Sequence, residues 1–140
     1  MATVNEVYDF LDKLAPFDLQ MDFDNAGFLV GRGETRVKRL LVALDITLPV
    51  AEEAAEKGCQ LIVSHHPVIF HPVKALTDRS ATGQVLLALT EGHMAAICAH
   101  TNLDAVMEGV NCCLARTLEL KDLEQLHQDG LDHEGRPYGI

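Results

Sequence analysis

Three short runs of apolar residues, each followed by a segment with helical spacing, constrain the fold of this 140-residue chain more than any other feature. The runs lie at residues 40–44, 61–63 and 95–99 and contain no polar side chain. Unbroken apolar strands are typical of a parallel sheet that is buried on both faces, and such strands alternate with amphipathic helices. The sequence therefore predicts an α/β fold, with a mostly parallel sheet and helices on both faces.

The helices are indicated by their capping residues. Thr3 and Glu6 form a capping box at the start of an amphipathic segment that ends before Pro16, and Ser80 is placed to cap a helix that ends at Gly92. Two more helices are expected at residues 49–57 and 108–118, a hairpin-like excursion or edge strand at residues 17–31, and the start of a fourth strand at residues 122–126.

The domain organisation expected from these elements is simple. Residues 1–140 fit one α/β domain. The tail from residue 127 is polar and predicts no helix or complete strand, whereas residues 137–140 read as the beginning of another strand. We therefore expect a single domain that is truncated at its C-terminal end, the first part of a longer protein.

Composition narrows the function classes. The net charge is −10, and Lys and Arg occur singly along the chain, so no basic patch for nucleic acid or an anionic membrane is predicted. There is no signal-like N-terminus and no apolar run near the roughly 20 residues of a membrane span, so a cytoplasmic location is the expectation. The four cysteines have no CxxC spacing and are interpreted as small core or surface thiols.

Polar residues follow each of the three predicted strands. Asp45 follows the first, Ser64, His65 and His66 the second, and residues 100–104 the third. Because the carboxyl ends of parallel strands meet at one edge of a sheet, these side chains are expected in one crevice. Adjacent histidines on an extended backbone point to opposite sides, so the pair can reach two metal ions, or one ion and a neighbouring structure.

His65, His66 and Asp104 form a mixed nitrogen and oxygen ligand set. Such a set suits zinc, manganese, iron or nickel, and Asp104 is suited to bridge a pair of ions. The alternative is that the histidines bond to backbone at strand ends and that Asp104 caps a helix. His100 and Asp45 could also orient a metal ligand or cap a helix, and either role explains them at least as well as direct metal binding. His71, His127 and His133 lie in polar segments and are expected on the surface.

Four segments also carry a resemblance to a known family. In order and spacing, residues 23–31, 43–47, 60–67 and 99–104 closely resemble the Nif-three-like family, whose bacterial members are labelled GTP cyclohydrolase type 2 homologues or dinuclear metal centre proteins. The resemblance spans nearly the whole chain. It departs from the usual family residues at Phe23, Glu108 and Cys112, outside the metal motifs.

The resemblance implies a fold, a site and an assembly. It implies that His65, His66 and Asp104 ligate a pair of divalent cations, whose site the family completes with a histidine and a glutamate that have no counterpart in this chain. It also implies the N-terminal portion of a Nif-three-like fold. Because family members assemble as toroidal hexamers, a homo-oligomer is expected.

Three functional hypotheses follow. The first is a metal-dependent hydrolase that acts on a nucleotide-like small molecule, with two cations activating a bridging water. The second is a non-catalytic metal-binding or protein-interaction module. The third is an inactive fragment that lacks the C-terminal metal ligands.

Overall fold

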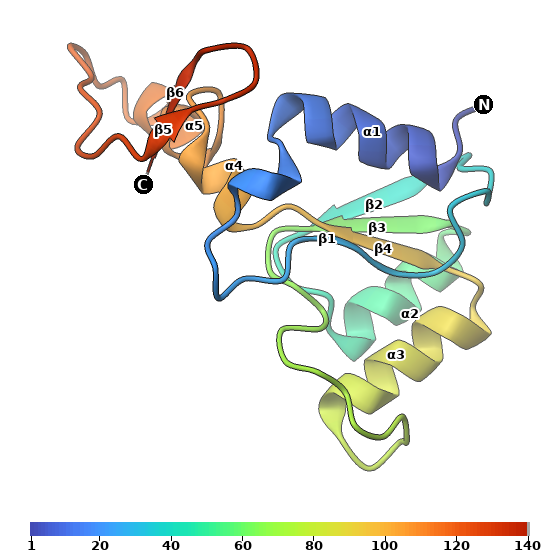
Figure 1. Ribbon diagram of the computed structural model, residues 1–140. Helices are drawn as coiled ribbons and strands as arrows, with labels where there is room; N and C mark the ends of the chain where they lie inside the picture. Colours follow the sequence, from blue (N-terminus) through green and yellow to red (C-terminus); the bar gives the residue numbers. More distant parts are fainter. Residues whose placement is uncertain (140) are drawn as a thin grey trace.

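The computed structural model describes residues 1–139 and places a four-stranded sheet between two layers of helices (Figure 1). A short hairpin follows near the C-terminal end of the chain. In chain order, the elements are α1 (Val4–Leu14), η1 (Phe17–Leu19), β1 (Gly27–Val30), β2 (Leu40–Ala43), α2 (Leu48–Glu56), β3 (Leu61–Ser64), α3 (Ala81–Glu91), β4 (Ala95–Cys98), α4 (Thr101–Ala105), α5 (Val110–Thr117), β5 (Gly130–Leu131) and β6 (Pro137–Tyr138).

The sheet has the order β1-β4-β3-β2. The strands β2, β3 and β4 are parallel, and their register pairs Ala43 with Ser64 and Ser64 with Cys98 at the carboxyl ends. At the outer edge, β1 pairs antiparallel with β4 and has an irregularity between Phe28 and Val30. The predicted mostly parallel sheet is confirmed, and the excursion at residues 17–31 contributes an edge strand.

Alternating side chains of the strands build two separate cores. Leu61 and Ile97 pack on one face against α1 and Phe17, whereas Ile62 and Ala96 pack on the other face against α2 and α3. Figure 1 shows α1 above the sheet and α2 and α3 below it. Both faces are therefore covered, as unbroken apolar strands predict.

The helix starts agree with their capping residues. Thr3 and Glu6 form the predicted capping box at α1, and the Ser80 hydroxyl accepts a hydrogen bond from the backbone N–H of Gly83 at α3. Thr47 caps α2, which begins at Leu48, one residue before the predicted start, and Pro49 lies in its first turn. These local interactions determine where each helix follows its strand and so how the strand ends are connected.

The C-terminal segment differs from the prediction. Residues 122–126 form no strand, and the edge of β4 at which a further parallel strand would pair is occupied by β1. Residues 130–138 form the hairpin β5–β6: β5 was not predicted, whereas β6 lies where the sequence predicts the beginning of a strand. The backbone N–H of Gly139 donates to the carbonyl of Ala105 at 3.0 Å. The segment predicted as one helix from residue 108 is α5, and Ile140 lies outside the described residues.

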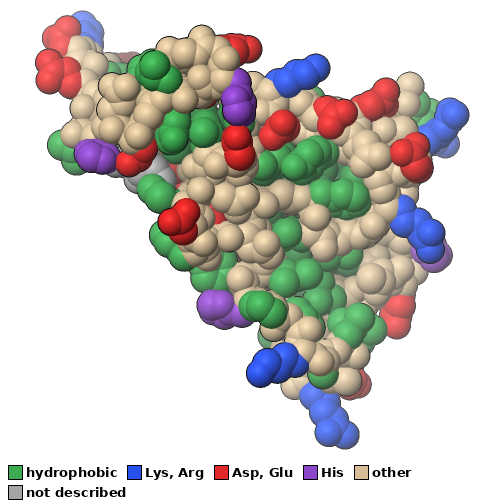
Figure 2. Space-filling view, viewed as in Figure 1, with side chains coloured by type: hydrophobic (Ala, Val, Ile, Leu, Met, Phe, Trp, Pro, Cys, Tyr) green, Lys and Arg blue, Asp and Glu red, His purple; other side chains and the backbone are tan. Residues whose placement is uncertain are grey.

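The surface carries its charges in a dispersed pattern. Figure 2 shows Lys and Arg side chains at separate places around the rim of one face, with Asp and Glu side chains between them. No basic cluster is visible on this face. Among the described helices, none has the length and apolar character needed to cross a bilayer.

We expect Leu61→Ala to destabilise the protein strongly. The Leu61 side chain is fully buried in the core beneath α1, so its truncation leaves a cavity and lowers the free energy of unfolding by about 2–5 kcal/mol. The matched control is Leu44→Ala, at a leucine that is 62% exposed, where the change stays within about 0.5 kcal/mol. Urea denaturation followed by circular dichroism measures both; equal losses would contradict the assignment of the core.

Candidate metal centre

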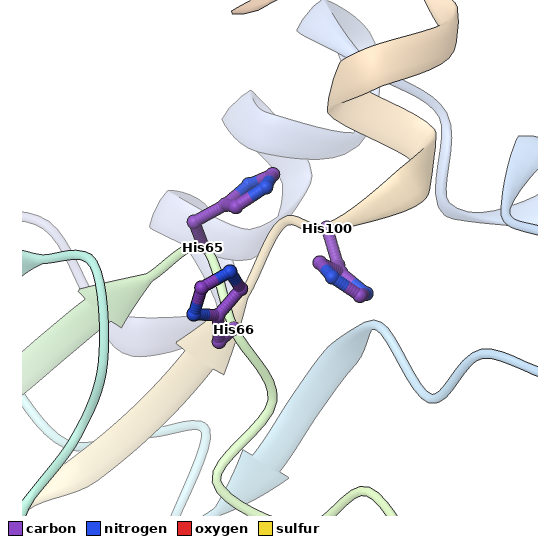
Figure 3. Close-up of side chains that lie close together, drawn as sticks. All are labelled: His65, His66 and His100. Atoms are coloured by element: carbon purple, nitrogen blue, oxygen red, sulfur yellow. The ribbon is translucent and has the colours of Figure 1, made fainter. Parts of the chain in front are cut away.

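Three histidines meet at the carboxyl edge of the sheet. His65 and His66 follow β3 directly, and His100 lies between β4 and α4 (Figure 3). One ring nitrogen from each of the three lies within 4.8 Å of those of the other two, and the ring centroids are 5.0 to 5.6 Å apart. The sequence predicted this convergence at the strand ends, and the structure adds His100 to the histidine pair as a third imidazole.

The orientation of the histidine pair differs from the prediction. Side chains that are adjacent on an extended strand point to opposite faces, yet the rings of His65 and His66 lie 5.1 Å apart at an angle of 47°. The reason is that β3 ends at Ser64, and the chain bends at both histidines. The Ser64 hydroxyl supports the bend by donating to the carbonyl of His66 at 2.9 Å. Both imidazoles therefore reach one cluster.

Each histidine in the cluster is held through its Nδ1 atom. His65 Nδ1 lies 2.9 Å from the carbonyl oxygen of Ala99, and His66 Nδ1 lies 2.7 Å from a carboxylate oxygen of Asp45. His100 Nδ1 lies 2.8 Å from a carboxylate oxygen of Asp24. All three partners are acceptors, so Nδ1 carries the proton and Nε2 of each neutral ring keeps a lone pair for a metal ion.

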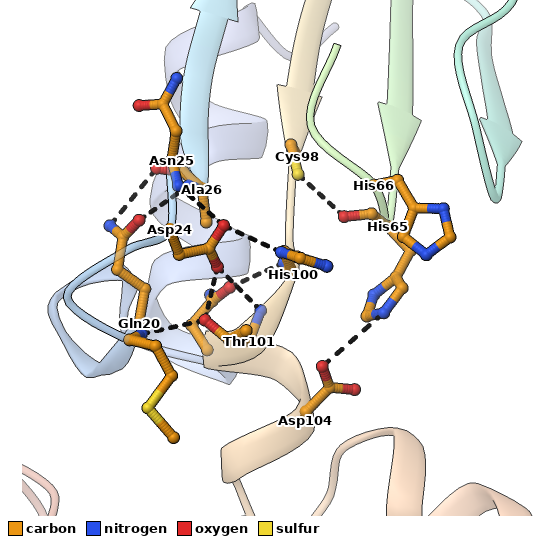
Figure 4. Close-up of polar contacts among 12 residues, drawn as sticks. Gln20, Asp24, Asn25, Ala26, His65, His66, Cys98, His100, Thr101 and Asp104 are labelled. Atoms are coloured by element: carbon orange, nitrogen blue, oxygen red, sulfur yellow. Dashed lines mark hydrogen bonds and ion pairs between the residues drawn. The ribbon is translucent and has the colours of Figure 1, made fainter. Parts of the chain in front are cut away.

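Asp24 is more buried than Asp45, the other carboxylate anchor. Figure 4 shows the Asp24 carboxylate between His100 and Thr101. Its side chain has no exposed surface, and its carboxylate accepts hydrogen bonds from His100 and from the backbone N–H and hydroxyl of Thr101. Burial raises the pKa of the Asp24 carboxyl, but the hydrogen bonds from Thr101, His100 and the Asn25 backbone outweigh burial and hold the pKa below its ordinary value. Asp24 is therefore a buried anion that fixes both His100 and the start of α4.

Sequence reasoning did not single out Asp24. The pattern at residues 17–31 predicts only a hairpin-like excursion or edge strand, and Asp24 is 76 positions away from the histidine that it holds. The contact forms because β1 runs antiparallel to β4, which pairs Gly27 with Cys98 and places the residues before β1 beside those after β4. No local pattern at Asp24 carries this information.

Asp104 lies next to the cluster but outside the group of three imidazoles. Its Oδ2 atom is 3.7 Å from Nε2 of His65, and its side chain is 24% exposed. The Asn111 amide donates to the Asp104 backbone carbonyl at 3.1 Å and ties this residue to α5. Asp104, which the sequence predicts as a metal ligand, is thus close enough to share a cation with His65. Asp45 instead orients the His66 ring, which is one of the roles that the sequence left open for it.

The remaining candidates lie away from the cluster. His127 and His133 are exposed and pair with Asp129 and Asp18, and His71 is also exposed. In the described part of the chain all four cysteines are free thiols. Burial, together with the negative charge of Asp24, raises the pKa of the Cys98 thiol to about 12, and its Sγ donates to the carbonyl of His65 at 2.8 Å. Cys98 therefore supports the bend as a neutral thiol.

The donor set fits a borderline divalent cation. Imidazole nitrogen suits zinc, copper, iron and nickel, and a carboxylate oxygen at the edge adds suitability for manganese. The two carboxylates and one carbonyl that hold the Nδ1 atoms are the orienting partners commonly found behind metal-binding histidines. Cys98 supplies no thiolate at neutral pH, so the residues present form a nitrogen and oxygen site.

Two pockets flank the cluster. One has a volume of about 270 Å³ and lies beside His66 and Asp45, where α2 and α3 begin. The other has a volume of about 390 Å³ and lies beyond Asp104, against α5. Volumes near 300 Å³ are at the lower end for small-molecule sites, so a ligand has room on either side of the histidines.

Among curated proteins, the chain is similar to bacterial relatives that are about twice as long or longer. It is 38% identical to the GTP cyclohydrolase 1 type 2 of Helicobacter pylori over 135 residues, which are 96% of this chain and 51% of that protein. It is 35% identical to a GTP cyclohydrolase 1 type 2 homolog of Clostridium acetobutylicum over 115 residues, which are 82% of this chain and 43% of that protein. The chain thus spans about half the length of these relatives.

Solved structures and a family model agree with these similarities. A hypothetical protein of Staphylococcus aureus superposes with a TM-score of 0.86 at 36% identity, over 91% of this chain and 36% of that one. A Bacillus cereus protein related to NIF3 has the same TM-score at 34% identity and the same coverage. The model of the family described as Duf34/NIF3 (NGG1p interacting factor 3) matches residues 2–138. The chain therefore belongs to the Duf34/NIF3 family.

Proposed function

We propose that this chain binds divalent metal through His65, His66 and His100, with Asp104 at the edge of the site. We further propose that it forms one wall of the dinuclear centre of a metal-dependent hydrolase with a nucleotide-like substrate. The observation that carries the proposal is the common anchoring of the three rings. Every Nδ1 atom has an acceptor partner at 2.7 to 2.9 Å, which leaves Nε2 of each ring available to a cation, and one ring nitrogen of each histidine lies within 4.8 Å of those of the other two.

The number of donors bears on how many ions are bound. Three imidazoles and Asp104 supply four side-chain ligands, enough for one tetrahedral ion with a carboxylate. A second ion would share Asp104 and take its other ligands from water or from groups outside residues 1–139. A bound divalent ion supplies Lewis acidity and lowers the pKa of a bound water towards neutrality.

The residues of this chain have defined tasks in that proposal. Asp24 and Asp45 keep the rings of His100 and His66 in one tautomer and one orientation, so little reorganisation is needed when a ligand arrives. Asp104 offers an acceptor oxygen 3.7 Å from His65, where it can bind a cation or hold a proton of a bound water.

The substrate class is supported by charge and by the names of the relatives. The chain carries a net charge of −10, so an anionic substrate would bind more readily once cations occupy the cluster. Two relatives carry names that refer to GTP cyclohydrolase 1 type 2. We therefore propose GTP as the first substrate to test, and assembly as a homo-oligomer as a further prediction that the mass in solution would test.

Replacing any one of the three clustered histidines should weaken metal binding. Loss of a residue that orients a metal ligand typically weakens metal binding about 10–100-fold. We expect His65→Ala, His66→Ala and His100→Ala each to lower the affinity for Zn²⁺ or Mn²⁺ by more than this, because each removes a ligand itself. His133→Ala is the matched control, because His133 is 75% exposed and lies on the C-terminal hairpin. Calorimetric titration of metal-free protein measures the affinities. Wild-type metal content in His65→Ala would refute the proposal.

Asp24→Asn should reduce both stability and metal affinity. The amide has the shape of the carboxylate but one acceptor oxygen fewer, so buried donors from Thr101 or His100 lose a partner. We expect about 1–3 kcal/mol less unfolding free energy and about 10–100-fold weaker metal binding. Asp22→Asn, at a neighbouring exposed position, is the control.

The loss of stability caused by Asp24→Asn should depend on pH in metal-free protein. The pKa of Asp24 is lowered on folding, so its charge stabilises the fold fully above the ordinary value of 3.8. As the pH falls through the lower folded value, this contribution is lost, and the stability difference between wild type and Asp24→Asn should shrink. A constant difference across the acid range would show that the charge of Asp24 does not matter.

Hydrolysis of GTP should depend on bound metal. We expect metal-loaded protein to convert GTP to a ring-opened product, a chelator to stop the reaction, and added Mn²⁺ or Zn²⁺ to restore it, because the cation provides the activated water. Liquid chromatography of the nucleotides measures this directly. Tight metal binding without any turnover would instead support the non-catalytic metal-binding module.

A further inference from the structure

Two pockets flank the histidine cluster, and the pocket beyond Asp104 is the larger and more apolar of them. It has a volume of about 390 Å³ and lies between the end of α4, one side of α5 and residues 123–126. Its floor includes Ala105, Val106 and Ala115, which are all buried, and Met107 and Leu123 add apolar surface to the walls. Aliphatic walls at this volume suit a flat organic ring.

The rim of the same pocket is acidic. Asp104 lies on the side of the histidines, and Glu124 lies on the side of the C-terminal segment. Carboxylates at both positions disfavour a phosphate group, and they favour a ring whose edge presents N–H donors. Asn111 already donates to the backbone of Asp104, which fixes the wall between pocket and cluster.

We infer that this pocket binds the base of a nucleoside, with a guanine-like edge of N–H donors directed at the acidic rim. The inference rests on the proposed function for the substrate class, and it adds the place where the base binds. Asp104 belongs to both sites, since it lines the pocket and lies 3.7 Å from Nε2 of His65. A base in the pocket therefore lies next to the histidine cluster, where the proposed ring opening would occur.

Two adjacent cysteines on α5 allow binding in the pocket to be tested by alkylation of their thiols. Cys112 lines the pocket and is partly buried, whereas Cys113 is exposed and does not line it. The other two cysteines are buried. Bound base should therefore shield Cys112 from an alkylating reagent and leave Cys113 reactive, so that one thiol reports the pocket and its neighbour controls for general effects.

The experiment uses the variants Cys113→Ser and Cys112→Ser, each of which leaves one reporter on α5. Alkylation by N-ethylmaleimide is followed by mass spectrometry in metal-free protein, with guanosine, adenosine, ribose 5-phosphate or inorganic phosphate as the probe. At guanosine concentrations of about ten times its Kd, mass action leaves about one protein in eleven free, so the Cys112 rate should fall about tenfold. The Cys113 rate should stay constant.

Several results would overturn the inference. These are no protection by guanosine, equal protection by adenosine or by ribose 5-phosphate, and equal changes at Cys112 and Cys113. A Cys112 thiol that becomes reactive only on dilution would also overturn it, because a second copy of the chain would then cover the pocket. Since no metal is present, failure of metal binding leaves the result unaffected, and the two proposals fail separately.

Discussion

The parallel pairing of β2, β3 and β4 is the constraint on which the histidine cluster depends. The register aligns Ala43, Ser64 and Cys98, so the chain leaves all three strands at the same edge. A slip of one residue would turn the buried Leu61 and Ile62 to opposite faces, at the cost of both cores. Packing of the aliphatic strands therefore also determines which polar residues meet at the edge.

The antiparallel edge strand β1 places a carboxylate beside His100, which the parallel strands do not do. Because β1 runs against β4, the residues before β1 lie at the edge where β4 ends, and Asp24 reaches His100 and Thr101. A fully buried carboxylate is costly unless it is hydrogen-bonded, and here the cost is offset by donors from two elements. The mixed sheet thus holds one imidazole from behind with a fixed negative charge.

The sequence predicts the parts of this structure that local patterns determine. Unbroken apolar runs predict β2, β3 and β4, capping residues predict the starts of α1 and α3, and the rule of common strand ends predicts that His65, His66 and Asp104 gather. The contact between Asp24 and His100 could not be predicted, since it depends on the placement of an edge strand. Likewise, the bend after Ser64 turns both rings to one side, which a strand pattern does not indicate.

Charge and proton positions at the edge limit which ligand the cluster can favour. Three carboxylates, those of Asp24, Asp45 and Asp104, each lie within 4 Å of a histidine ring nitrogen, and the net charge of the whole chain is also negative. With Nδ1 bonded to an acceptor and Nε2 open, the rings are arranged to donate electron pairs to a cation, and the carboxylates behind His66 and His100 increase the basicity of those two rings. Because the high pKa of the Cys98 thiol keeps its sulfur neutral, nitrogen and oxygen are the donors available. The edge is therefore suited to a divalent cation first, and to an anion only through that cation.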